Sequence, residues 1–207
     1  MRRQFIPAVL TMVVFTLLLG LGYGLLVTGV AQLGFKDKAD GSIVERDGKK
    51  VGSSLIGQAF VDEDGNPIER YFQSRPSPAF RLYGKTETGY DPTLSSGSNL
   101  GPTNPELLEK VRQLVDAYRE LNGLGPDVRV PVDAVTTSGS GLDPHISVAN
   151  ARLQAERVAN ARGLPVGRVR RLVDDNTSGR TLGVLGEKAV NVLELNLALD
   201  RSSETEN

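Results

Sequence analysis

The stretch IPAVLTMVVFTLLLGLGYGLLVTGV, residues 6–30, decides how this chain is organised. It lies within a run from Gln4 to Phe35 that contains no charged residue. A helix needs about 20 apolar residues to cross a hydrocarbon layer of roughly 30 Å, so the run is long enough to span a membrane. A cleaved secretory signal is the alternative, but the apolar regions of signal peptides have only about 7–15 residues. We therefore expect residues 1–31 to form a permanent transmembrane anchor.

Small residues recur on one face of this expected helix. Gly20 and Gly24 are four residues apart, and Thr28 continues the row. Helices in lipid gain little by burying apolar surface and associate instead by close approach at small residues. The row predicts docking against another membrane helix, although glycine is also common in membrane helices for other reasons.

Charge predicts the orientation of the anchor. Arg2 and Arg3 precede the apolar run, whereas the two lysines that follow it, at 36 and 38, are offset by neighbouring aspartates. Because positive residues favour the cytoplasmic side, we expect a single-pass protein with a cytoplasmic N-terminus and an exported soluble domain.

The remaining chain is expected to contain a juxtamembrane linker (32–50), one mixed α+β soluble domain (51–200) and a disordered polar tail (201–207). Asn104 and Gly123 are typical of the start and the end of a helix, and the residues between them carry an apolar stripe at helical spacing. Two further helices are expected, from the Asp143–Pro144 pair to Arg162 and from Pro165 onward. Strands are expected at 53–61, 67–73, 181–186 and 190–199.

Composition excludes several classes of function. Residues 32–207 contain 22 basic and 25 acidic residues, a difference of −3, which argues against a nucleic-acid-binding protein. The chain has no cysteine and one histidine, which excludes thiolate and multi-histidine metal sites. Six arginines are expected on solvated helix faces, at 152, 157, 162, 168, 170 and 171.

One motif, S-G-S-x-L-x-P, occurs at residues 96–102 and again at 138–144, in each case just before an expected helix. Glycine and serine before a helix N-terminus can hold an anion, or they can form capped turns whose hydroxyl groups bind their own backbone. His145 follows the second copy, and we expect it to brace the turn at the start of the next helix. A hydrolase that uses His145 with Ser138 or Ser140 is the less favoured alternative.

Several strings in this chain resemble the KdpC family, which supplies one of the components of the bacterial Kdp potassium-transporting P-type ATPase. The resemblance covers nearly the whole chain, and the strings that carry it are TGVAQ (28–32), GSSLIGQ (52–58), SGSNLGPTNP (96–105), VTTSGSGLDPHIS (135–147), ARGL (161–164) and VNVL (190–193). The resemblance implies a bacterial cell-membrane protein that works beside a channel-like A subunit, an ATP-hydrolysing B subunit and a small F subunit, with membrane lipid around its anchor. It also implies a non-catalytic role in stabilising the complex, with no tightly bound cofactor.

The resemblance implies a second role, that of a catalytic chaperone that raises the affinity of the B subunit for ATP at a shared site. Ser138, Gly139, Ser140, Gly141 and Gln154 are the residues of this chain on which that role would fall. The role conflicts with the expected topology, because ATP is cytoplasmic and the soluble domain is expected outside. We therefore favour the accessory role and keep nucleotide handling as the alternative.

Overall fold

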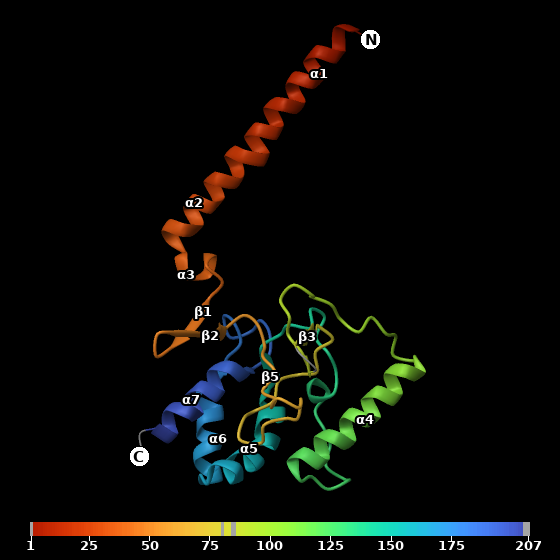
Figure 1. Cartoon of the computed structure of the whole chain (residues 1–207), viewed down its shortest axis with the longest axis vertical. Helices are drawn as coiled ribbons and strands as arrows, with labels where there is room; N and C mark the ends of the chain where they lie inside the picture. Colours follow the sequence, from red (N-terminus) through yellow and green to blue (C-terminus); the bar gives the residue numbers. More distant parts are fainter. Residues whose placement is uncertain (1, 80, 84–85, 205–207) are drawn as a thin grey trace. The chain divides into compact units, whose positions relative to one another are not determined.

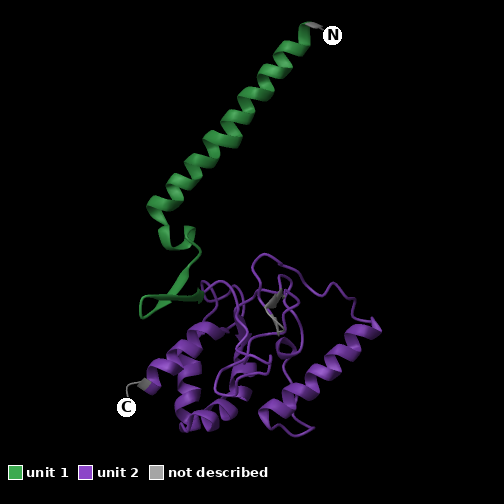
Figure 2. Cartoon of the chain, in the orientation of Figure 1, with its two compact units in different colours: residues 1–53 green, residues 54–207 purple. Residues whose placement is uncertain are grey.

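The structure is a computed structural model that describes residues 2–79, 81–83 and 86–204 (Figure 1). The chain divides into two compact units, residues 1–53 and residues 54–207 (Figure 2). Helices and small antiparallel sheets together make up the second unit, and an apolar helix opens the first. The predicted α+β class with one N-terminal apolar helix is therefore confirmed.

The first unit begins with a long helix that is made of α1 (Arg2–Phe15), the π-helical segment η1 (Thr16–Tyr23) and α2 (Gly24–Gly34) (Figure 1). Its residues from Arg3 to Gly34 are apolar enough, and numerous enough, to cross a membrane. No residue of η1 or α2 is buried by the rest of the chain. After this helix come a short helix and an antiparallel hairpin: α3 (Lys36–Ala39), β1 (Ile43–Arg46) and β2 (Lys49–Ser53).

The second unit is built on an antiparallel sheet with the strand order β5-β7-β6. The strands are short and the helices that pack with them are longer: β5 (His145–Ser147), α5 (Val148–Arg162), α6 (Val166–Asp175), β6 (Thr177–Ser178), β7 (Ala189–Asn191) and α7 (Val192–Glu204). The fully buried side chains between these elements form one apolar core, which includes Phe72, Ile146, Val158, Val173, Val190 and Leu195.

Helix α4 (Pro105–Asn122) has the boundaries that the sequence predicts. The side chain of Asn104 accepts a hydrogen bond from the Glu106 N–H at 2.8 Å, and Gly123 ends the helix with a φ of 62°. The helix contacts α5 through the Tyr118 hydroxyl group, which donates to the Asn150 side chain at 2.9 Å. Three short elements complete this unit: β3 (Arg81–Tyr83), β4 (Thr86–Thr88) and η2 (Val132–Ala134).

The prediction of a strand at residues 190–199 is wrong, because this segment is mostly helix α7. The Asn191 side chain accepts from the Glu194 N–H at 3.2 Å and so caps the helix start. The buried positions of the helix are residues 192, 193, 195, 196 and 199, which recur at helical spacing. Helix α7 also includes residues 201–204, which the sequence predicted as part of the tail, and residues 205–207 lie outside the described part of the chain.

The other expected strands are also absent from the described residues. Residues 54–60 and 68–73 are irregular, and only an isolated bridge joins Val61 to Pro67. Residues 181–186 form a tight turn whose ends, Thr181 and Leu185, make a second isolated bridge. Runs of apolar and β-branched residues predicted strands here, but no neighbouring strand among the described residues offers these segments a hydrogen-bonding edge.

Side chains, instead of a neighbouring strand, hold the irregular segment around Phe72, whose ring is buried in the core. Asn196 accepts from the Phe72 N–H at 2.9 Å and donates to the Phe72 carbonyl at 3.0 Å. Gln154 likewise accepts from the Gln73 N–H at 2.7 Å and donates to the Gln73 carbonyl at 3.1 Å. Each amide group thus replaces one pair of hydrogen bonds of a β-ladder. Buried backbone groups need such partners, which explains why an Asn and a Gln lie in this core.

We predict that Asn196→Leu lowers the free energy of unfolding by about 2–5 kcal/mol, because it leaves the buried N–H and carbonyl of Phe72 unpaired. The measurement is chemical denaturation of the full chain in detergent. Asn160→Leu is the matched control, since Asn160 is an exposed asparagine on helix α5 and should change the stability by less than about 0.5 kcal/mol. Equal stability of the two variants would contradict the role given to Asn196.

Candidate functional site

The two copies of the S-G-S-x-L-x-P motif lie against each other in the folded chain. The Ser96 N–H donates to the Ser140 carbonyl at 2.9 Å, and the Ser95 hydroxyl group donates to the same oxygen at 3.2 Å. The repeat in the sequence therefore corresponds to a pair of stacked turns, which we call the Ser-Gly turn pair (residues 95–98 and 138–141).

Glycine is required where the two turns touch. Gly141 has a φ of +70°, and a Cβ at this position would lie 2.5 Å from the Ser96 carbonyl oxygen. A Cβ at Gly97 would lie 3.1 Å from the Gly139 carbonyl oxygen. The Ser77 hydroxyl group also donates to the Gly141 carbonyl at 2.6 Å, which fixes the turn pair to the irregular segment that follows residue 73.

The hydroxyl groups of the second turn are engaged locally. The Ser138 and Ser140 hydroxyl oxygens lie 3.4 Å apart, and the Ser140 hydroxyl group accepts from the Leu142 N–H at 3.1 Å. This arrangement is the one that the capped-turn interpretation of the motif describes.

Gln154, the fifth candidate for nucleotide contact, lies in the core and is only 1% exposed. Its amide group bonds to the backbone of Gln73, accepts from Arg157 at 2.9 Å and donates to Asn150 at 2.9 Å. Among the described residues it makes no hydrogen bond to residues 138–141, so the structure does not bring the five candidates together. Their role in nucleotide binding stays a prediction.

His145 lies on strand β5, not in the first turn of a helix as the sequence predicted. The following helix begins at Val148, and the Ser147 hydroxyl group caps it by accepting from the Asn150 N–H at 3.1 Å. The expected helix boundary was wrong because Asp143–Pro144 resembles a helix start, whereas the real cap comes three residues later.

A charged cluster surrounds His145. Its Nδ1 lies 3.2 Å from an Asp143 carboxylate oxygen, and the other oxygen of Asp143 lies 3.3 Å from the Arg75 guanidinium group. The hydrogen bond to Asp143 raises the pKa of His145, and the same bond lowers the pKa of Asp143. These residues line an open cleft of about 350 Å³ together with Glu187 and Lys188. The His145 ring thus contacts the aspartate two residues before it, and its role in bracing a turn stays a prediction.

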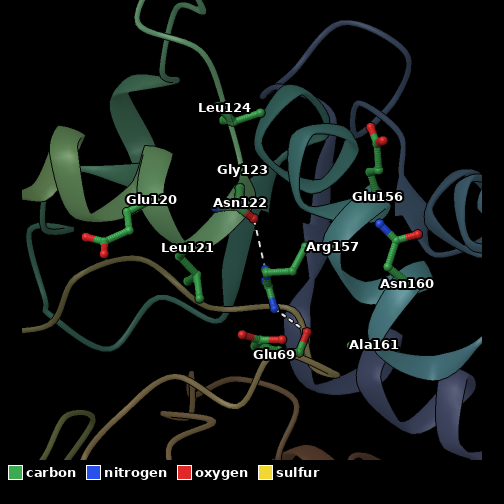
Figure 3. Close-up of a pocket in the computed structure, with 10 residues that line it drawn as sticks. All are labelled: Glu69, Glu120, Leu121, Asn122, Gly123, Leu124, Glu156, Arg157, Asn160 and Ala161. Carbon is green, nitrogen blue, oxygen red and sulfur yellow. Dashed lines mark hydrogen bonds between the residues drawn. The ribbon is translucent and has the colours of Figure 1, made fainter.

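A cleft of about 590 Å³ lies between the C-terminal end of α4 and helix α5 (Figure 3). At its floor, Arg157 donates to the Asn122 side chain at 2.9 Å and to the Glu69 carbonyl. Figure 3 shows the Arg157 side chain reaching between these two residues. Glu69, Glu120 and Glu156 also line the cleft.

Arg157 is 7% exposed, so its expected place on a solvated face was wrong. Desolvation lowers the pKa of Arg157 to about 10, at which the side chain is still charged at neutral pH. Its donors bind the Glu69 and Tyr71 carbonyls and the side-chain oxygens of Asn122 on α4 and Gln154 on its own helix. The sequence could have indicated that Arg157 is buried, because it lies next to Val158 and within one turn of Gln154 and Ala155, which are all buried on the same helix.

The small-residue row lies on the long helix of the first unit. A Cβ at Gly20 or at Gly24 would meet nothing within 4 Å, so this face is open along the chain's own helix. The Thr28 hydroxyl group donates to the Gly24 carbonyl at 2.9 Å, so its hydrogen is already used within the helix. The docking of this face stays a prediction.

We predict that Gly141→Ala destabilises the full chain by at least about 1–2 kcal/mol, because alanine is strained at a positive φ and its Cβ would overlap the Ser96 carbonyl. Gly139→Ala is the matched control, since a Cβ there meets nothing within 4 Å. Chemical denaturation in detergent measures both variants. A Gly141→Ala variant as stable as the control would show that the two turns do not need their close contact.

The comparisons of this chain with known proteins all indicate the same family. Residues 5–201 match the family model KdpC, described as K+-transporting ATPase, c chain. A protein from Mycobacterium bovis is 55% identical over 201 residues, which is 97% of this chain and all of that protein. A protein from Koribacter versatilis is 49% identical over 97% of this chain and 95% of its own length.

A third relative, from Caulobacter vibrioides, is 50% identical over 94% of this chain and 91% of its own length. All three relatives bear the name Potassium-transporting ATPase KdpC subunit. The match covers both the apolar helix and the second unit. The chain therefore belongs to the KdpC family of potassium-transporting ATPase subunits.

Proposed function

We propose that this chain is a non-catalytic accessory subunit of an ATP-driven potassium import complex. In this proposal the anchor and the soluble domain stabilise the assembly of a channel-like subunit with an ATP-hydrolysing subunit and a small third subunit. The name that the relatives share, potassium-transporting ATPase subunit, supports membership of such a complex. Membership in this family and the apolar helix together support a location in the membrane.

The observation that carries the proposal is the long helix from Arg3 to Gly34, which the rest of the chain leaves unburied. An unburied apolar helix needs lipid or other membrane helices around it. Its row of Gly20, Gly24 and Thr28 offers the close approach by which helices pack in lipid. The chain is thus suited to joining larger membrane subunits through this helix.

The internal contacts of the second unit agree with a structural role. Its buried polar side chains, among them Gln154, Asn196 and Arg157, bind this chain's own backbone. A nucleotide that contacted Gln154 would have to displace hydrogen bonds that hold the core together. We therefore leave the catalytic-chaperone hypothesis outside the proposal, as a prediction that rests on family resemblance.

We predict that replacing Gly20 and Gly24 with leucine lowers the recovery of the complex by roughly tenfold, which corresponds to about 1.4 kcal/mol of lost helix packing. The measurement is co-purification of the other pump subunits with the full chain. Gly22→Leu is the matched control, because Gly22 lies on the opposite side of the helix and has room for a Cβ. Equal recovery of the double variant and the control would contradict docking through this face.

The proposed orientation has its own test. Arg2 and Arg3 before the apolar run predict a cytoplasmic N-terminus and a soluble domain on the outside. Added protease should therefore digest residues 54–207 in spheroplasts without lysis, while a cytoplasmic marker protein stays intact. Digestion only after lysis would place the domain inside the cell and would restore the nucleotide-handling alternative.

A further inference from the structure

The side chain of His145 is the one side chain of this chain that changes its charge near neutral pH. The sequence contains a single histidine and no cysteine. Histidine is the only side chain whose ordinary pKa lies between pH 5 and 8, and apart from it only the terminal amino group titrates close to that range. Two buried groups with shifted pKa values stay outside it, because desolvation lowers the pKa of Arg157 only to about 10 and raises the pKa of Tyr90 to about 12. A response of the folded domain to pH near neutrality therefore runs through His145.

Asp143 connects His145 to two other parts of the second unit. One of its carboxylate oxygens accepts from the His145 backbone N–H at 2.9 Å and lies 3.2 Å from the ring Nδ1. The other oxygen lies 3.3 Å from the Arg75 guanidinium group, which donates to the Thr137 carbonyl at 3.1 Å. We call Arg75, Asp143 and His145 the His-Asp latch. The latch links strand β5 to the irregular segment after residue 73 and to the residues just before the second Ser-Gly turn.

The contact between the His145 ring and Asp143 needs a hydrogen on Nδ1. A carboxylate only accepts hydrogen bonds, and a neutral imidazole carries one hydrogen that either of its two nitrogens can hold. In the protonated ring both nitrogens carry hydrogen, so Nδ1 always donates and the hydrogen bond is charge-assisted. Loss of the proton weakens the contact in two ways, because the attraction between opposite charges disappears and the tautomer with hydrogen on Nε2 places two acceptors against each other.

Carboxylates outnumber cations around the His145 ring. The charged groups come from the elements that surround the ring: Asp143 from its own segment, Asp133 from η2, Glu187 and Lys188 from the residues before β7, Glu194 from α7 and Arg75 from the irregular segment. Its partner across the sheet on β7, Asn191, is uncharged. The hydrogen bond to Asp143 and the charges of Asp143 and Glu194 raise the pKa of His145, and burial opposes them. The surroundings therefore favour the protonated ring.

The pH range of the latch follows from the directions of these pKa shifts. Because the pKa of His145 is higher in the folded chain, its contribution to stability is complete below the unfolded value of about 6.5 and is lost as the pH rises through the folded value. The hydrogen bond with His145 lowers the pKa of Asp143, so the contribution of Asp143 is lost only in acid, as the pH falls through a folded value below 3.8. The latch is therefore closed at about pH 5–6 and loosens above neutral pH.

We propose that the His-Asp latch is a pH-sensitive switch built into the fold: a proton on His145 fixes the second Ser-Gly turn to strand β5, and its loss loosens that turn. The inference needs only side chains of this chain, so it stands apart from the proposed function. With the soluble domain outside the cell, as proposed above, the switch would respond to the pH of the medium. The His145 side chain is 42% exposed, and ion pairs that solvent reaches contribute modestly, so we expect the protection of the turn against hydrogen exchange to change by about two- to fivefold.

Hydrogen exchange of the full chain in detergent tests the inference. Between about pH 6 and about pH 8, we expect the amides of residues 138–145 to lose about two- to fivefold of their protection after correction for intrinsic exchange rates, while helix α4 stays constant. His145→Asn should abolish this dependence on pH, because the asparagine amide offers a donor near the place of Nδ1 that does not titrate. Arg171→His in the His145→Asn background is the matched control, since it adds a histidine at an exposed position of helix α6, away from the latch, and should not restore the dependence.

An NMR titration of the unaltered chain keeps the inference testable even if His145→Asn does not fold. Because the chain has one histidine, the ring signal needs no assignment, and its titration midpoint is measured in the folded chain and in the chain unfolded in urea. We expect the higher midpoint in the folded chain. A folded midpoint that is equal or lower would overturn the inference, and so would hydrogen exchange that responds to pH in the same way in the wild type and in His145→Asn.

Discussion

The fold depends on the pairing of one irregular backbone segment with buried amide side chains. Phe72 enters the core from an irregular segment without a neighbouring strand, and Asn196 and Gln154 bind the N–H and carbonyl groups of Phe72 and Gln73 respectively. An unpaired buried backbone group costs about 1–3 kcal/mol, and these two side chains remove that cost for the backbone groups that they bind. The apolar packing of Phe72 follows from this pairing, since it fixes where the ring enters the core.

The same hydrogen bonds extend from the segment to the elements around it. Asp133 of η2 binds both the Ser147 hydroxyl group and the Asn150 side chain, Asn150 binds Gln154, and Gln154 binds Arg157. Arg157 then reaches helix α4 through Asn122. Connected buried polar groups raise the cost of breaking any one of them. The network therefore ties η2, helix α5 and helix α4 to one another.

Sequence patterns predicted the features that local chemistry determines. The apolar N-terminal run, the Asn104 cap and the Gly123 end of α4 all follow from spacing and from residue type. The errors arose where distant residues decide the structure. Residues 190–199 resembled a strand because the segment is short and rich in Val and Leu, and Arg157 resembled a surface residue because its acceptors come from α4 and from residues 69–71. The contact between the two Ser-Gly turns was equally invisible, although the repeat itself was plain.

The long sequence separation of the amide contacts has a consequence for synthesis. Phe72 is 124 residues from Asn196, and Gln73 is 81 residues from Gln154. A growing polypeptide therefore emerges with its central segment unsatisfied and acquires the final partner only when α7 has left the ribosome. A product truncated before residue 196 has an open core that proteases can attack.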